Sequence, residues 1–520
     1  MIANHLLSWI TFFPLIGSVV ILMLPGAQRA LIRSVAVIAT AVPLGLSFYL
    51  WLFAFDASSP ALQLVERATW ISAGDNFRVL YFMGVDGLSM PLVALTSLLL
   101  FIAVYASWGI EKGMKGYFSL LLLLEVGING TFVSLDLFLF YVFWEVMLLP
   151  MYFLIGIWGG PRREYAAIKF FLYTLAGSVL MLVAIVALYL ISGTFSIASY
   201  SENGRNVAGL LELARTGNLS GAKLLAGGSL LGVSFGDWVF WFFFVAFAIK
   251  VPVFPFHTWL PDAHVEAPTP ISVILAGILL KLGGYGMFRI GFPIAPESFE
   301  KARTFLAVLG TINIVYGAYV AMGQTDFKKL VAYSSVSHMG YVLLGAAAMT
   351  DWGVKGAVLQ MFNHGTSSAM LFLIVGVIYD RAHHRDLNGF GGLMAQMPRY
   401  GGLTTLGFFA ALGLPGLAGF ISEAMTLLGS FKTYPTLTVI SCIGVVMTAA
   451  FLLWTIQRVF LGKLNPKYAR LPDISGREVF CQAPFAALCV LFGVAPWLIL
   501  DVLGPAVTTF LQLFPGLKPA

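Results

Sequence analysis

The run WVFWFFFVAFAIKVPVFPFHTWL, residues 238–260, decides the class of fold. It is long enough to cross the hydrocarbon core of a bilayer, which needs roughly 20 apolar residues. Lys250 lies near its middle, and Pro252 and Pro255 follow. A charge at that depth costs from about 3 to more than 10 kcal/mol and normally faces a bundle interior, where it carries ions or protons. The run predicts a proline-broken membrane helix with a functional lysine.

The composition extends this prediction to the whole chain. Of the 520 residues, 59% are hydrophobic and 10% are charged, against roughly 45–50% and 25% in a soluble domain. These values exclude a water-soluble protein. The net charge of +6 comes from scattered Lys and Arg rather than from a basic run with aromatics, so no nucleic-acid partner is expected. Cys442, Cys481 and Cys489 lack the spacing of a zinc site or a disulfide framework.

Apolar runs near 20 residues predict an all-α polytopic membrane protein with fourteen transmembrane helices. The first run lacks a basic leader and a small-residue cleavage site, so it is counted as a span and not as a signal peptide. The predicted spans are 6–24, 35–55, 88–108, 117–135, 138–157, 167–191, 238–260, 271–290, 305–322, 330–349, 354–379, 403–428, 436–461 and 483–500.

The basic residues predict the orientation. Connectors after odd-numbered helices hold sixteen of the thirty Lys and Arg, Lys328 and Lys329 among them, and the opposite side holds eleven, Arg289 among them. Basic connectors favour the inner side, so both termini are expected on the outer, periplasmic face. The two long connectors, 56–87 and 192–237, are the only expected extramembrane structure, and neither is long enough for a domain.

Ionisable side chains inside the predicted spans are the functional candidates, because each is costly to insert. Glu125 could instead cap or pair within its helix, the histidines could be satisfied core residues, and Lys169 is expected to reach the interface. The predicted proton-translocation residues are Glu145, Lys250, Lys281, Glu423, His338 and His364, with Glu125 as a weaker candidate.

Two spans carry breaks at matching positions. Pro252 follows Lys250 in the seventh span, and Pro415 precedes Glu423 in the twelfth, within LGLPGLAG at 412–419. Proline removes an amide donor and frees a carbonyl, which is tolerated at membrane depth where the helix lines a cavity. Each break alone could be a plain kink. Because each is the fourth helix of a run, 4–8 or 9–13, the pair favours two repeats with a transport site.

Motifs for other chemistry are absent from the sequence. There is no P-loop, no dinucleotide fingerprint and no cysteine ligand set, so no nucleotide, flavin or iron–sulfur site is expected. The segment HTWLPDAH at 257–264 could suggest a metal site and the helical histidines could suggest haem. A structured re-entrant loop and a proton path are the preferred interpretations, and no metal site is predicted.

Five motifs carry a family resemblance. GVDGLS at 84–89, FLFYVFWE at 138–145, HTWLPDAH at 257–264, LAGILLK at 275–281 and YSSVSHMG at 333–340 resemble the subunit M family of respiratory NADH:quinone oxidoreductase, complex I, within the Mrp antiporter-like superfamily. The lysine-bearing eighth helix and HTWLPDAH are shared with sister subunits and Mrp-type antiporters. The third-helix motif and a glutamate in helix 12 favour subunit M.

The resemblance implies two inverted five-helix repeats, helices 4–8 and 9–13, with helices 7 and 12 broken. It divides the chain into helices 1–3 (1–116), a first repeat (117–290), a second repeat (302–461), and a connector with helix 14 (462–520). It also implies that Glu145, Lys250, Lys281 and Glu423 form a proton pathway, with His338 and His364 on its central axis.

The implied function is a proton-translocating membrane-arm subunit in a bacterial inner membrane. Its implied partners are sister antiporter-like subunits, other membrane-arm subunits and lipids, while flavin, iron–sulfur clusters and quinone belong to partner subunits and no cofactor to this chain. An Mrp-type cation/proton antiporter is the alternative. A membrane scaffold with vestigial charges is a third class, disfavoured by the insertion cost of the buried charges.

Overall fold

The computed structural model describes residues 1–520 except 1–4, 75–76, 203, 220–228 and 515–520. Helices dominate it. The first half forms α1 (Leu6–Met23), α2 (Arg29–Tyr49), α3 (Met90–Ala106), α4 (Met114–Val133), α5 (Leu137–Val146), α6 (Leu148–Trp158), α7 (Arg163–Ser192), α8 (Leu210–Arg215), α9 (Phe235–Lys250) and α10 (Trp259–Glu266). The second half forms α11 (Thr269–Ile274), α12 (Leu280–Gly286), α13 (Phe292–Ile294), α14 (Pro296–Met322), α15 (Phe327–Ala348), α16 (Asp351–Ala382), α17 (Leu393–Gln396), α18 (Pro398–Ala411), α19 (Ala418–Thr433), α20 (Pro435–Val459), α21 (Gly476–Val494) and α22 (Trp497–Gln512).

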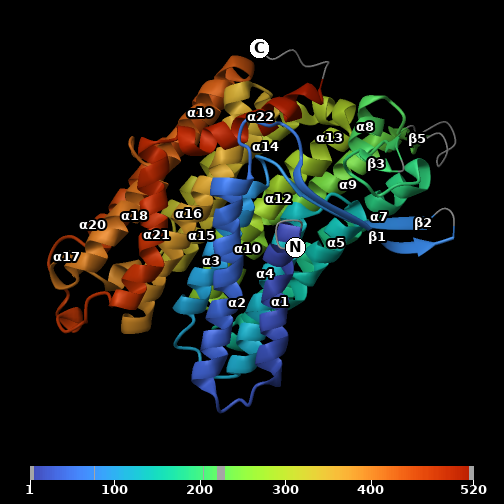
Figure 1. Ribbon diagram of the computed structural model, residues 1–520. Coiled ribbons are helices and arrows are strands. Elements are labelled where there is room, and N and C mark those ends of the chain that lie inside the picture. The colour runs from blue at the N-terminus through green and yellow to red at the C-terminus, as the bar shows by residue number, and fades with distance from the viewer. Residues whose placement is uncertain (1–4, 75–76, 203, 220–228, 515–520) are drawn as a thin grey trace.

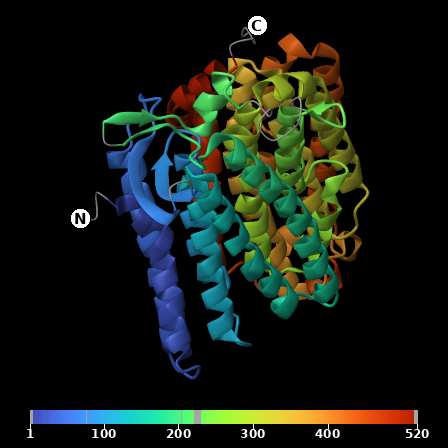
Figure 2. The ribbon, with the colours of Figure 1, turned by 90° about the vertical axis from the view of Figure 1, so that its right-hand side faces the viewer.

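The helices form one bundle with strands near one of its ends (Figures 1 and 2). By length and composition, eleven helical segments of the described residues can cross a membrane. The predicted spans 7 and 12 are each divided, as α9 with α10 and α18 with α19. Outer faces of the long helices stay apolar: Leu22 is 57% exposed, Leu172 56% and Val446 66%. Such faces suit lipid contact, because hydrocarbon chains take the place of water around the bundle.

The last predicted span is wrong as a single helix. Residues 483–500 are divided between α21, which ends at Val494, and α22, which begins at Trp497. Pro496 lies between them. Proline has no N–H to continue the helix and biases the preceding residue away from the helical region. The two helices therefore change direction at Ala495 and Pro496.

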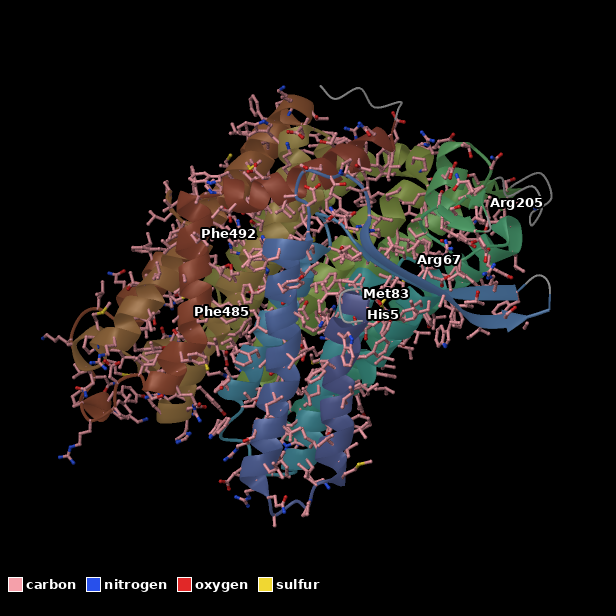
Figure 3. All side chains as sticks on the ribbon, viewed as in Figure 1. His5, Arg67, Met83, Arg205, Phe485 and Phe492 are labelled. Atoms are coloured by element: carbon pink, nitrogen blue, oxygen red, sulfur yellow. The ribbon has the colours of Figure 1, made fainter. Side chains whose placement is uncertain are left out.

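Strands are the second departure from the all-helical prediction. The connector 56–87 forms an antiparallel hairpin of β1 (Gln63–Ala73) and β2 (Phe77–Val85), and 192–237 contains two smaller hairpins, β3 (Tyr200–Glu202) with β4 (Arg205–Val207) and β5 (Ser229–Leu230) with β6 (Val233–Ser234). Figure 3 places Arg67 on the β1–β2 hairpin and Arg205 on the β3–β4 hairpin, at the same end of the molecule.

Ionic contacts attach the first hairpin to the bundle and to its neighbour. Glu66 accepts a hydrogen bond from the backbone N–H of Leu7 at 2.7 Å, at the start of α1. Arg78 pairs with Glu202 of β3, Nη1 to Oε2 at 2.7 Å, and this guanidinium lowers the pKa of the Glu202 carboxyl. The hairpins therefore join segments that lie more than 100 residues apart in sequence.

Candidate functional site

Lys281 lies at the centre of the buried polar site. Its helix runs continuously from Thr269 to Ile294 and contains a π-helical segment at Leu275–Leu279. The side chain is fully buried, and Nζ donates to the carbonyl oxygen of Ala276 at 2.5 Å. Single π-helical turns are frequent at functional sites. Here the wider turn contains Ala276, whose carbonyl accepts the hydrogen bond from the Lys281 ammonium group.

His364 of α16 is in direct contact with this lysine. Nδ1 of His364 lies 2.6 Å from Nζ of Lys281. A charged lysine can only donate, so Nδ1 is then the acceptor and the ring proton sits on Nε2. In the described residues Nε2 of His364 has no hydrogen-bond partner.

His338 of α15 and Glu423 of α19 continue the series. The rings of His338 and His364 have centroids 5.5 Å apart, and Nε2 of His338 lies 3.5 Å from a carboxylate oxygen of Glu423. All of these side chains are buried. Four of the predicted residues, from four separate helices, therefore form one series in the order Lys281, His364, His338, Glu423.

The helix break before Glu423 contributes to this series. The carbonyl of Ala411 lies four residues before Pro415, so no proline N–H can reach it. Nε2 of His338 lies 2.8 Å from this oxygen, and Nδ1 lies 2.7 Å from the carbonyl of Ser334. A neutral imidazole has one N–H donor. With acceptors at both nitrogens, this site suits the imidazolium form.

The helix break at Pro252 is bridged by an asparagine that the sequence did not indicate. Asn313 of α14 accepts from the N–H of Phe254 at 2.8 Å and donates to the carbonyl of Pro252 at 3.2 Å. Trp259 donates through Nε1 to the carbonyl of Ile249 at 2.9 Å. Asn363 of α16 similarly donates to Ala418 at the second break, at 2.7 Å. Both predicted breaks therefore have side-chain partners for their freed backbone groups.

Lys250 and Glu145 lie near each other without the contact that a tight charge pair requires. Lys250 is buried, with Nζ 5.2 Å from the ring centroid of Trp144 and 5.5 Å from that of Phe170. Its charge interacts with that of Glu145, but no ion pair within 4.0 Å joins them among the described residues, and Oε1 of Glu145 has no partner. Lys250 and Glu145 therefore do not form a close ion pair in this structure.

Glu125 is isolated from the series. It is fully buried in α4, and neither carboxylate oxygen has a partner among the described residues. Asn129, one helical turn further on, is equally buried and unpartnered. No cap or local ion pair for Glu125 is present in that part of the chain. Its role stays a prediction.

The sequence-based prediction assigned Arg289 and Lys328 to connectors and did not select Asp86. Arg289, counted among the outer connector bases, pairs with Asp86 at 2.5 Å and with Tyr285 at 3.1 Å. Lys328, assigned to an inner connector, is a buried residue of α15. The sequence signal for Lys328 is indistinguishable from that of Lys329 beside it. Asp86 and Arg289 are 203 residues apart, so no local pattern could pair them.

The HTWLPDAH segment is structured. It forms a short 3₁₀ turn and α10, and its Asp262 pairs with Lys169 at 2.7 Å. The side chain of Lys169 is 18% exposed, and its position at the membrane interface stays a prediction. Within the described ranges, no three His, Cys, Asp or Glu side chains gather as metal ligands.

A broken-helix bundle with a buried series of titratable groups is typical of membrane proteins that transport ions or protons. Residues 134–448 match the family described as NADH:quinone oxidoreductase/Mrp antiporter, TM, and the chain belongs to this family. It is 43% identical to NADH-quinone oxidoreductase subunit M of Rhodobacter capsulatus, over 98% of this chain and 97% of that one. It is 38% identical to subunit M of Rickettsia conorii, over 99% and 100%.

Solved structures agree with the family assignment. Respiratory complex I from Thermus thermophilus with bound NADH contains a chain with a TM-score of 0.83 and 30% identity, covering 98% of this chain and 99% of that one. The Mrp complex from Dietzia sp. DQ12-45-1b gives a TM-score of 0.82 over 99% of each chain, at 20% identity, which shows the fold alone. The chain is thus an antiporter-like membrane-arm subunit of NADH:quinone oxidoreductase, a proton-translocating enzyme.

Proposed function

We propose that protons cross this subunit along the series Lys281, His364, His338 and Glu423, supplied from Lys250 under the control of Glu145. The observation that carries the proposal is the 2.6 Å contact between Lys281 and His364. From His364 the series continues to the His338 ring and from there to Glu423. Each member can gain or lose a proton, and each is costly to bury without a function.

The packing of the first repeat supports a supply from Lys250. Gly283, two residues after Lys281, packs so closely on α9 that a Cβ there would lie 2.9 Å from Cβ of Lys250. The lysine helices of the first repeat are therefore in backbone contact. A shift at the break after Lys250 would change the surroundings of both lysines.

The division of the chain into two repeats and fourteen membrane spans is part of the same proposal. Breaks at 251–258 and 412–417, each bridged by an asparagine, support two inverted repeats of five helices, residues 117–290 and 302–461, within fourteen spans. The flanking units are 1–116 and 462–520. We place the chain in a bacterial inner membrane with both termini outside, among sister antiporter-like subunits and lipids, with flavin, iron–sulfur clusters and quinone held by partner subunits.

The test is NADH-driven acidification of proteoliposomes that contain the whole enzyme. Lys281→Ala removes the central titratable group, so proton transfer should slow by on the order of a hundredfold, the low end of what a positioned acid or base contributes. Assembly should persist, because loss of a buried charge relieves an insertion cost. A variant that assembles and pumps at the wild-type proton-to-electron ratio would refute the proposal.

The alternative, an Mrp-type antiporter, is tested with the purified chain alone. An antiporter should exchange sodium or potassium for protons without partner subunits, whereas a pumping subunit should be silent. Cation-dependent pH changes in liposomes that contain only this chain would favour the antiporter.

A further inference from the structure

A cavity of about 490 Å³ opens at the end of the bundle where α15 and α21 begin and α16 ends. Its lining is rich in polar side chains, among them Lys328, Glu266, Asp380 and Gln482. The positive-inside count assigns this end to the inner face. None of these residues belongs to the series from Lys281 to Glu423.

Gln482 indicates that the cavity holds water. The side chain is fully buried in α21, and neither its amide nitrogen nor its amide oxygen has a partner in the described residues. Buried amides are nearly always hydrogen-bonded to protein or to ordered water. The cavity is far larger than one water molecule and offers several polar partners, the conditions for stable hydration.

Lys328 is one of the residues that line this cavity. It is 2% exposed. Nζ donates to the carbonyl of Ala267 at 2.7 Å and lies 3.5 Å from Oγ of Ser272, at the start of the helix that carries Lys281. No ion pair within 4.0 Å neutralises this ammonium among the described residues, although Arg385 beside it pairs with Asp326. Such a buried, unpaired lysine is costly unless it has a function.

The contacts of Lys328 and Lys281 lie close together on the helix that carries Lys281. Lys281 donates to Ala276, four residues after Ser272, and four residues of helix rise about 6 Å. The His264 ring lies close enough to interact electrostatically with both lysines. It is fully buried and stacked on Phe372 with centroids 4.4 Å apart. Both its ring nitrogens lack partners in the described part of the chain.

We propose that this cavity is the proton uptake vestibule, and that Lys328 passes protons through His264 to Lys281. The proposal rests on the proposed function of Lys281. Lys328 gives one proton through water to a His264 nitrogen and regains one from water in the cavity. His264 releases its proton to Lys281 when that lysine is neutral, so only N–H bonds form and break. The lining carries acidic side chains, Glu266 and Asp380, together with basic ones, Arg385 and Arg477, so charges of both signs surround the water of the cavity.

The first experiment replaces the lysine in the whole enzyme and measures NADH-driven proton translocation in proteoliposomes. Lys328→Met keeps the length but loses the proton site, so proton delivery should slow on the order of a hundredfold. Lys328→His, which restores a titratable nitrogen, should recover translocation. Lys329→Met, next in sequence and absent from the cavity lining, is the matched control and should behave as wild type.

A second readout does not depend on pumping. In a chain with Cys442, Cys481 and Cys489 replaced by serine, Gln482→Cys should react with a charged, membrane-impermeant methanethiosulfonate added at the inner face only, and the reaction should lower proton translocation. Cys489 as the sole cysteine, two turns further along α21 and absent from the cavity lining, should stay unlabelled.

The outcomes separate the two proposals. Slow translocation in Lys281→Ala with wild-type translocation in Lys328→Met overturns the uptake route and leaves the proposed function standing. Wild-type translocation in both overturns the proposed function. Should Lys328→Met fail to assemble, the labelling decides, and a Gln482→Cys site that is unreactive from the inner face overturns the vestibule.

Discussion

At the scale of single residues, the site depends on which atoms of each imidazole meet donors or acceptors. His364 faces a lysine with Nδ1, whereas His338 has a carbonyl oxygen at each nitrogen. The first arrangement suits a neutral ring and the second a charged one. In the proposed pathway, this difference between the two adjacent histidines favours proton transfer from His364 toward His338 and Glu423.

We expect Glu145 to act on Lys250 through its charge, because no ion pair within 4.0 Å joins the two side chains among the described residues. At separations beyond 4 Å and an effective dielectric near 20, the attraction is below about 4 kcal/mol. Glu145→Gln should therefore leave assembly intact and sharply reduce proton translocation, measured in proteoliposomes of the whole enzyme. Glu164→Gln, an exposed carboxylate at the start of α7, should have no effect. Normal pumping by assembled Glu145→Gln enzyme would leave the pair without a role.

At the scale of elements, breaks and close approaches determine how the helices meet. The breaks at Pro252 and Pro415 free backbone groups, and Asn313, His338 and Asn363 take them up. These contacts come from other helices, α14 to α16. Each break is therefore held in place by the bundle, which distinguishes it from a flexible kink.

The close packing of α9 on the helix that carries Lys281 can be tested by adding a side chain at Gly283. A Cβ there would lie 2.7 Å from the carbonyl oxygen of Phe247, which is backbone and cannot rotate away. Gly283→Ala should destabilise the subunit by about 1–3 kcal/mol, as overpacking does, and lower its thermal unfolding temperature. Gly45→Ala in α2, with nothing within 4 Å of the added carbon, is the control and should leave this temperature unchanged or raised.

At the scale of the whole molecule, the distribution of basic residues predicts the orientation. A reporter fused after Lys518, which lies outside the described residues, should appear on the outer face, and a reporter in the connector 458–478 on the inner face. Protease protection in intact and inverted vesicles measures both. Reversed protection would place the vestibule at Lys328 on the outer face and would turn the uptake route into a release route.

The sequence by itself determined the membrane class, most of the spans, both helix breaks and the candidate residues. These features are local: a run of apolar residues, a proline or a charge at bilayer depth has its cost wherever the neighbours lie. The break between α21 and α22 had a local signal too, in Pro496, but a continuous apolar run concealed it. The hairpin of β1 and β2 was missed because the segment 56–87 reads as a polar connector.

Only the tertiary structure decided which candidates meet. Lys281 and His364 are 83 residues apart, and His338 reaches a carbonyl 73 residues away, so their contacts depend on how α15 and α16 pack against the Lys281 helix. The same packing buried Lys328 and left Lys329 half-buried. It also kept Lys250 and Glu145 out of contact. Burial and partners are set by the assembled bundle, because each side of a helix has a different neighbour.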